Sequence, residues 1–302
     1  MVVNDHITER ITALAGGVGG AKLAHGLMLA QPGAPLSIIV NTADDFSLFG
    51  LHISPDLDTV LYTLAGLAHP ETGWGIAGDT FATLEMIARY GRDTWFQLGD
   101  KDFATHILRT ERLAGGASLT ATTAELATAL GVTAQILPMC DEPVATLVDP
   151  LEGTLEFQEY FVRRRHQDSV VGVRFAGIDA ATVPAGVATA IDEATVIAIC
   201  PSNPIVSIGP ILAVPGMREL LTRTSAPVVA VSPIIGGQAL KGPADSMLRT
   251  LGYDVSPLGV AAIYRDIIDG IVIDEEDAAL AQEIEALGVA VRMAQTIMRD
   301  DN

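Results

Sequence analysis

The sequence predicts an α/β fold, a Rossmann-like three-layer sandwich in which helices cover both faces of a mainly parallel sheet. Up to residue 41 it carries a strand–helix–strand pattern, and several short apolar runs follow at wider spacing. Hydrophobic residues make up 49% of the chain but aromatic residues only 5%, so Ala, Val, Ile and Leu must fill the core. That composition suits a sheet buried on both faces better than an aromatic-rich β-sandwich.

The first strand–helix–strand unit is predicted over residues 10–41. Residues 10–15 form an apolar run typical of a strand, a cluster of glycines follows, and residues 21–30 have helical spacing. Pro32 and Gly33 end that helix, and residues 36–41 predict a second buried strand. Such a unit implies a parallel pair of strands joined by a right-handed crossover.

The middle of the chain predicts a helical insertion over the sheet. Residues 59–129 have mainly helical periodicity interrupted by glycines, which divides the chain into a main domain (1–58 and 130–302) and an insertion (59–129). The remaining elements are predicted as strands at 135–139, 196–200, 228–231 and 271–273, an antiparallel hairpin or flap at 154–175, and an acidic closing helix at 275–287.

The charge of the chain restricts its partners. The formal net charge is −19, which repels phosphate backbones and argues against nucleic acid as a partner. A phosphorylated substrate must therefore meet local positive potential, backbone N–H groups or a metal ion. The chain has only three lysines, Lys22, Lys101 and Lys241, and each stands within two residues of a glycine.

The sequence predicts a cytoplasmic protein. Its first residues lack the pattern of a signal peptide, and no membrane association is expected. The longest uncharged stretch, 196–217, contains four prolines and is interpreted as a strand followed by a loop. Cys140 and Cys200 lie in apolar surroundings and are expected to be buried thiols of a reducing compartment.

The segment Gly16-Gly17-Val18-Gly19-Gly20-Ala21-Lys22 is the first candidate site. A phosphate could approach the backbone at Gly17, Gly19 and Gly20, where a helix N-terminus offers N–H groups and Lys22 could add a charge. The segment has the spacing of neither a Walker A loop nor a dinucleotide fingerprint. Tight packing of the helix is the alternative explanation for its glycines.

Carboxylates are concentrated after the second predicted strand. Asp44 and Asp45 follow it directly, and Asp56 and Asp58 come soon after. Residues beyond strand carboxyl ends line the ligand crevice of such sheets, so Asp44, Asp45 and Asp58 are candidate Mg²⁺ ligands. Asp45 or Asp58 could alternatively act as the catalytic base toward a hydroxyl group, and a single Asp could simply cap a turn or helix.

Three further segments could bind a polar ligand. Lys101 precedes His106, and Arg109 lies three residues after it, so the last two could share a helical face; capping by Asp100 or Asp102 is the alternative. Ser202 and Asn203 follow another predicted strand and could bind phosphate or base atoms. The segment 232–237 has the same position after the strand at 228–231. No zinc-ligand cluster or nucleophile elbow is present.

Taken in their order along the chain, the candidate segments described above resemble those of the CofD/FbiA family. Its members are the 2-phospho-L-lactate transferases of deazaflavin coenzyme F-420 biosynthesis. The resemblance covers essentially the whole chain, and its most specific parts are residues 53–62 and 99–106, supported by 201–204 and 232–236. The glycine segment and residues 201–204 also resemble YvcK-like proteins, which look like sugar-nucleotide-binding regulators. A regulator without transferase activity is therefore the alternative.

The resemblance implies a Rossmann-like fold, Mg²⁺ as cofactor and a GMP-linked donor. The donor carries phospholactate or phosphoenolpyruvate, as lactyl- or enolpyruvyl-2-diphospho-5'-guanosine, and the acceptor is the deazaflavin Fo. The products are (dehydro) coenzyme F-420-0 and GMP. By the same resemblance Asp58 and Lys101 contact Fo, and we expect His106 beside them. Members of the family often have Arg in place of Lys101, and Lys lacks its planar fork. The sequence leaves open which donor is used and whether the protein is a homodimer.

Overall fold

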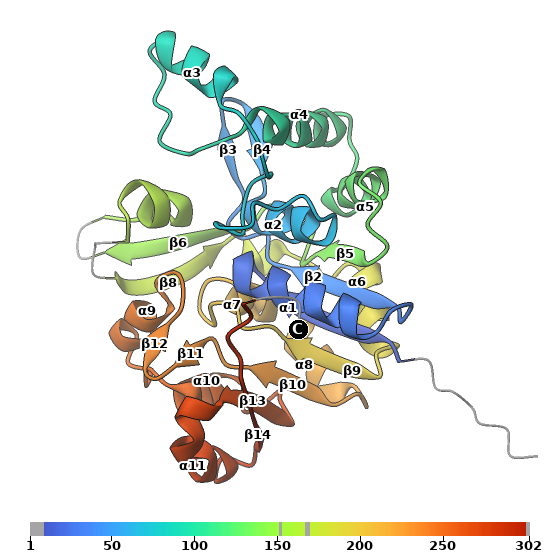
Figure 1. Cartoon of the computed structure of the whole chain (residues 1–302), viewed down its shortest axis with the longest axis vertical. Helices are drawn as coiled ribbons and strands as arrows, with labels where there is room; N and C mark the ends of the chain where they lie inside the picture. The colour runs from blue at the N-terminus through green and yellow to red at the C-terminus, as the bar shows by residue number, and fades with distance from the viewer. Residues whose placement is uncertain (1–8, 151–152, 167–169, 300–302) are drawn as a thin grey trace, which may run out of the picture.

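The computed structural model describes residues 9–150, 153–166 and 170–299 (Figure 1). Seven strands form the central sheet in the order β14-β13-β10-β9-β1-β2-β5, and every neighbouring pair is parallel. The strands are β1 (Ile11–Ala15), β2 (Leu36–Val40), β5 (Gln135–Pro138), β9 (Val196–Ile199), β10 (Val228–Val231), β13 (Gly270–Asp274) and β14 (Ala290–Ala294). The predicted parallel α/β fold is confirmed.

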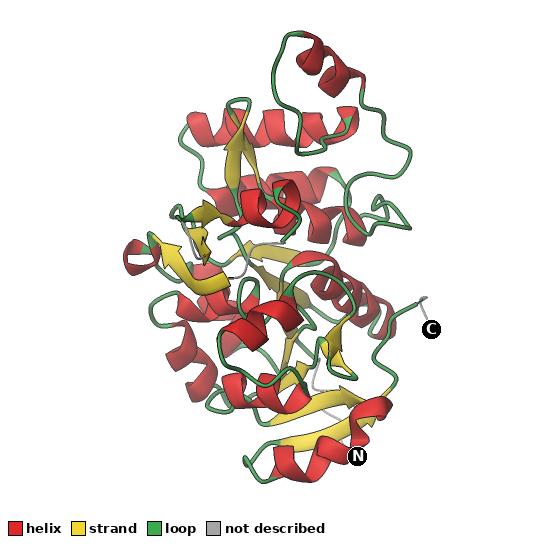
Figure 2. Cartoon of the chain, turned by 90° about the vertical axis from the view of Figure 1, so that its left-hand side faces the viewer, coloured by secondary structure: helices red, strands yellow, loops and turns green. Residues whose placement is uncertain are grey.

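Helices cover both faces of this sheet, as the side view in Figure 2 shows. In β1, Ile11, Ala13 and Ala15 belong to one hydrophobic cluster and Leu14 to the other, as the two-residue period of a strand requires. The first cluster includes residues of α1 (Gly17–Ala30), α2 (Pro55–Leu64) and α5 (Leu119–Ala129). The second includes residues of α6 (Ala185–Asp192), α7 (Ile208–Ala213), α8 (Met217–Arg223), α10 (Pro257–Tyr264) and α11 (Ala281–Glu285).

The order of the strands reverses between β1 and β9. From β1 the chain continues outward to β2 and β5, returns to β9 on the other side of β1, and proceeds through β10 and β13 to β14. In an open parallel sheet the connections diverge at such a switch point and leave a ligand crevice at the carboxyl ends of the strands. The segments that follow β1, β2 and β9 all emerge at this edge.

A group of helices and a hairpin stands above the sheet in Figure 1. The hairpin consists of β3 (Phe46–Leu48) and β4 (Leu51–Ile53), and it shares a small hydrophobic cluster with α3 (Ala82–Arg89) and α4 (Asp100–Ala114). By contrast, α2 and α5 pack on the sheet itself. The division into a main domain and an insertion over 59–129 stays a prediction, and the hairpin was missed because its strands have only three residues each.

The second half of the chain departs from the prediction at several elements. Strand β6 (Ala145–Pro150) pairs antiparallel with β7 (Leu155–Glu156) and β8 (Val170–Ala176), so the two strands in the predicted range 154–175 pair with β6 and not with each other as a hairpin; residues 167–169 of that range lie outside the described residues. The predicted closing helix is a 3₁₀ segment (Glu275–Leu280) followed by α11. The strand β14 after it was not predicted, because its residues are mostly exposed and carry no clear apolar run.

The stretch 196–217 is not a membrane span. It contains β9 and the short helix α7, whereas we predicted a strand and a loop. Within the described ranges, the structure has no helix whose length and apolar character would let it cross a bilayer. Two small strands, β11 (Ile234–Ile235) and β12 (Gln238–Ala239), and α9 (Ala244–Thr250) complete the fold beyond β10.

Candidate active site at the carboxyl edge of the sheet

The glycine segment begins α1 rather than preceding it. The helix starts at Gly17, whose φ of 61° favours glycine, and not at Ala21 as predicted. A side chain at Gly19 would place its Cβ 2.5 Å from the carbonyl oxygen of Pro201, and one at Gly20 would lie 2.6 Å from Ser202 Oγ. These glycines therefore let α1 pack against the turn that follows β9, which supports the packing explanation and brings both segments to the switch point.

Ser202 and Asn203 hold this turn in place. The Ser202 hydroxyl donates to the Gly16 carbonyl oxygen at 2.8 Å and accepts from the Gly16 N–H at 3.1 Å. Asn203 Oδ1 accepts from the N–H groups of Ile205 at 2.9 Å and Val206 at 3.3 Å. Both side chains thus contact backbone, and their predicted binding of phosphate stays a prediction.

The three lysines also contact backbone oxygens. Lys22 Nζ donates to the carbonyl of Met298 at 3.0 Å, on the exposed side of α1. Lys101 Nζ donates to the carbonyls of Ala77 at 3.2 Å and Gly78 at 3.1 Å. Lys241 Nζ donates to the carbonyl of Thr72 at 3.1 Å. Two lysines therefore bind the loop between α2 and α3, and the predicted roles of Lys22 toward phosphate and of Lys101 toward Fo stay predictions.

Asp44, Asp45 and Asp56 form a group beside the start of α1. Asp56 Oδ2 accepts from the Asn41 side-chain amide at 2.9 Å, and a Cβ at Gly16 would lie 2.7 Å from the same oxygen. Asp45 Oδ2 accepts from the Ser54 hydroxyl at 2.7 Å, and His52 Nε2 lies 2.8 Å from it. The Oδ1 atoms of Asp44 and Asp45 are buried without a hydrogen-bond partner.

Burial makes negative charge unfavourable in this group. It is the main cause that raises the pKa of Asp44 well above its ordinary value, and the neighbouring Asp56 charge raises it further. Burial likewise raises the pKa of Asp45, against the opposing contact with His52. It raises the pKa of Asp56 to about 6, although the Asn41 amide opposes the shift.

Two members of this group, Asp44 and Asp45, could hold a divalent cation. Mg²⁺ binds one or two carboxylates and keeps several waters or phosphate oxygens, so two unpaired carboxylate oxygens suit it. A cavity of about 10 Å³ adjoins them, lined by Asp44, Asp45, Phe46 and Thr146 among others. That volume is about the room a single water or small ion needs.

Asp58 lies in a different set of contacts. Arg109 binds both of its carboxylate oxygens, with Nη1 3.0 Å from Oδ2 and Nη2 on Oδ1. His106 Nδ1 is 3.3 Å from Arg109 Nη1, and His106 Nε2 lies 3.2 Å from Asp102 Oδ1 without forming a hydrogen bond. Asp102 Oδ1 in turn accepts from the Tyr62 hydroxyl at 2.7 Å. All five side chains are buried, and together they connect α2 with α4.

The shared helical face of His106 and Arg109 is thereby confirmed, but the capping prediction was wrong. Asp100 accepts from the N–H groups of Ala82 and Thr83 and so caps α3, while Asp79 accepts from the Lys101 N–H at the start of α4. The sequence did not single out Arg109 as the partner of Asp58. Only the structure, which brings Arg109 of α4 to Asp58 of α2 across 51 positions of the chain, reveals that pair.

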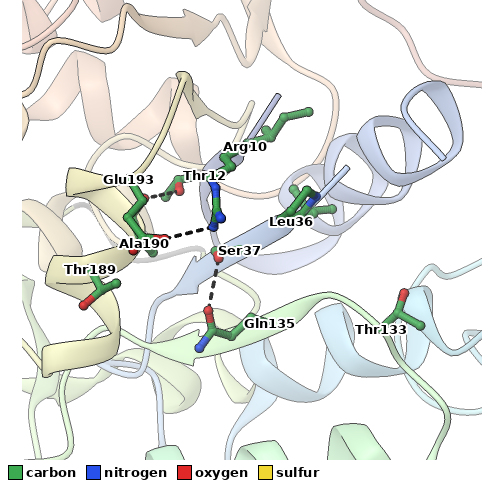
Figure 3. A pocket seen from close by; sticks show the side chains of 11 residues that line it. Arg10, Thr12, Leu36, Ser37, Thr133, Gln135, Thr189, Ala190 and Glu193 are labelled. Carbon is green, nitrogen blue, oxygen red and sulfur yellow. Dashed lines mark hydrogen bonds and ion pairs between the residues drawn. The ribbon is translucent and has the colours of Figure 1, made fainter. Parts of the chain in front are cut away.

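Figure 3 shows a cavity of about 190 Å³ at the opposite, amino-terminal edge of the sheet. An ion pair of 2.9 Å between Arg10 and Glu193 and a hydrogen bond of 3.2 Å between Ser37 and Gln135 lie along its wall. Its volume is below the range of roughly 300–1,000 Å³ that is usual for small-molecule sites. None of the sequence motifs reaches this edge, so the candidate active site is the one at the carboxyl edge.

The model of one protein family, described as 2-phospho-L-lactate transferase CofD, matches residues 11–299. The chain belongs to the CofD family. The match includes all of the carboxylates, glycines and lysines described above, so the resemblance stated from the sequence motifs is confirmed.

Individual members of the CofD family are similar to this chain over almost their whole length. A 2-phospho-L-lactate transferase of Methanosarcina acetivorans is 44% identical, covering 94% of this chain and 92% of its own. A phosphoenolpyruvate transferase of Thermobifida fusca is also 44% identical, covering 96% and 93%. A solved structure from the UPF0052 family of Bacillus halodurans has a TM-score of 0.65 at 17% identity, covering 95% and 93%, which shows the fold alone.

Proposed function

We propose that this transferase of the CofD family moves a phospholactyl or phosphoenolpyruvyl group from a GMP-linked donor to the deazaflavin Fo. A hydroxyl oxygen of Fo attacks the phosphorus that carries the three-carbon acid, and the bond from this phosphorus to the bridging oxygen breaks. GMP leaves with that oxygen, and the hydroxyl proton passes to a carboxylate of the protein. The equal identity to both kinds of named transferase does not favour one donor over the other.

Two buried carboxylate oxygens without partners, those of Asp44 and Asp45, carry this proposal. They follow β2 at the carboxyl edge of the sheet, and Asp56, whose charge acts on Asp44, lies against Gly16 at the start of α1. A diphosphate could not approach these carboxylates without a cation between them. Phosphoryl transfer depends chiefly on positioning and on neutralising such charge.

We assign Mg²⁺ to Asp44 and Asp45, where it would neutralise the negative charge of the diphosphate. We leave Asp58 out of the ligand set, because Arg109 already binds both of its oxygens. The backbone at the start of α1 and the turn after β9 would hold the guanylate part. Asp58, Lys101 and His106 would contact Fo, and Asp58 would accept the proton of the attacking hydroxyl.

The test is turnover by the purified protein with Mg²⁺, Fo and each guanylylated donor. We expect GMP to be released, measured by chromatography, and the mass of the product to identify the preferred donor. Thermal shifts with GDP and a UDP-sugar complete the test. Absence of GMP release with both donors, together with stabilisation by the UDP-sugar alone, would contradict the proposal and favour a sugar-nucleotide-binding regulator.

A further inference from the structure

We propose that Arg109 is a positioning residue for group transfer, which fixes the orientation of the Asp58 carboxylate toward the acceptor hydroxyl. In this view the chain of contacts from Tyr62 through Asp102 and His106 fixes Arg109 in turn. This inference rests on the proposed function, in which Asp58 contacts the acceptor.

The geometry of the pair restricts Asp58 strongly. A guanidinium group that binds both oxygens of a carboxylate holds its plane as well as its position, which a single hydrogen bond cannot do. Arg109 is itself only 1% exposed, and His106 contacts it on its Nη1 side at 3.3 Å. The carboxylate plane of Asp58 is therefore fixed relative to Arg109 in the folded protein.

Joining two helices by a buried ion pair carries a free-energy penalty, because both charged groups lose their hydration. Burial disfavours the charge of Arg109, although the Asp58 carboxylate outweighs this effect and raises the pKa of the guanidinium. Arg109 Nε also lacks a hydrogen-bond partner. Replacing buried ion pairs by apolar side chains is often neutral or stabilising, so stability alone gives no reason for a charge here.

The position of the pair supplies that reason. Arg109 extends from α4, the helix that also carries Lys101 and His106, to Asp58 on α2, which packs on the sheet. It therefore sets the distance between the residues that we assign to the acceptor and the sheet edge that holds the donor. A displacement of about 1 Å between reacting groups can reduce a rate about 10²-fold.

The first experiment is Arg109→Lys, which keeps the charge but cannot bind both oxygens. We expect kcat to fall about 10²-fold, whereas KM for the GMP-linked donor stays close to the wild-type value. Arg112→Lys is the matched control, because Arg112 lies on the same helix and pairs with Glu125 at the exposed surface. This control should keep wild-type kinetics and wild-type Tm.

A second variant covers the case in which Arg109→Lys does not fold. Tyr62→Phe removes only the hydroxyl that donates to Asp102, at the far end of the chain of contacts. It should lower kcat without changing KM for the donor, while Tyr264→Phe, which removes a buried hydroxyl without a partner, should leave kcat unchanged.

The outcomes are distinguishable. An active wild-type enzyme together with a folded Arg109→Lys variant of unchanged kcat would overturn the inference alone. Equal loss of kcat in Tyr62→Phe and Tyr264→Phe would also overturn it, since the effect would then be one of packing. A wild-type protein that is inactive with both donors would overturn the proposed function and the inference with it.

Discussion

Asp56 carries a negative charge that the folded state disfavours. Burial raises its pKa from 3.8 to about 6, so between these values the folded chain binds more protons than the unfolded chain. The free energy of unfolding consequently falls as the pH rises through this window, and the loss is nearly complete above it. The ionised Asp56 therefore lowers the stability of the folded chain near neutral pH.

We therefore predict that Asp56→Asn stabilises the protein near neutral pH. At pH 8 the gain in free energy of unfolding should reach up to about 3 kcal/mol, and at pH 5 it should be about half as large. Urea denaturation at the two pH values measures it. A gain that is equal at both pH values would show that the charge of Asp56 is not its cause.

The unpaired oxygens of Asp44 and Asp45 give a second prediction at this scale. Asp45→Asn should raise the Mg²⁺ concentration needed for half-maximal transfer by at least about tenfold, since a carboxylate ligand is replaced by a neutral one. Titration of GMP release with Mg²⁺ measures the change. Asp192→Asn, at an exposed position of α6, should leave the titration unchanged; an unchanged titration in Asp45→Asn would remove it from the ligand set.

Among the elements, the start of α1 is sensitive to added volume. Gly19→Ala should lower Tm by several degrees and reduce activity, because its Cβ would meet the backbone oxygen of Pro201 and separate α1 from the turn after β9. Gly26→Ala, on the same helix but with nothing within 4 Å, should instead stabilise the protein by up to about 1 kcal/mol. Calorimetry of both variants is the measurement, and equal effects would contradict the packing argument.

Elements with a strong apolar pattern were predictable from the sequence, and weakly patterned ones were not. Central strands such as β1 and β2 are buried on both faces, so their continuous apolar residues identify them. The edge strand β14 and the three-residue strands β3 and β4 form through pairing with neighbouring strands, and their own sequences carry no pattern that identifies them. The candidate site shows the same difference. Its carboxylates were predictable because they follow a strand directly, whereas the Asp58–Arg109 pair depends on how the fold brings α2 and α4 together.

At the scale of the whole molecule, the reversal of strand order brings three distant segments to one crevice. GDP should therefore bind there, and with Mg²⁺ at about 100 times its Kd it should raise the free energy of unfolding by about 2.7 kcal/mol. Thermal denaturation with and without Mg²⁺ measures this gain. A GDP effect that needs no Mg²⁺ would contradict the role of the cation in joining the diphosphate to Asp44 and Asp45.

The two carboxylate oxygens without partners also bear on how long the protein would last in a cell. Without cation and donor, the folded chain holds three buried acidic groups whose negative charge burial disfavours, which lowers the free energy needed to open the chain. Proteases cleave the opened chain, so a small change in stability alters abundance several-fold. Binding of the proposed cation and donor would stabilise the folded chain and so slow its degradation.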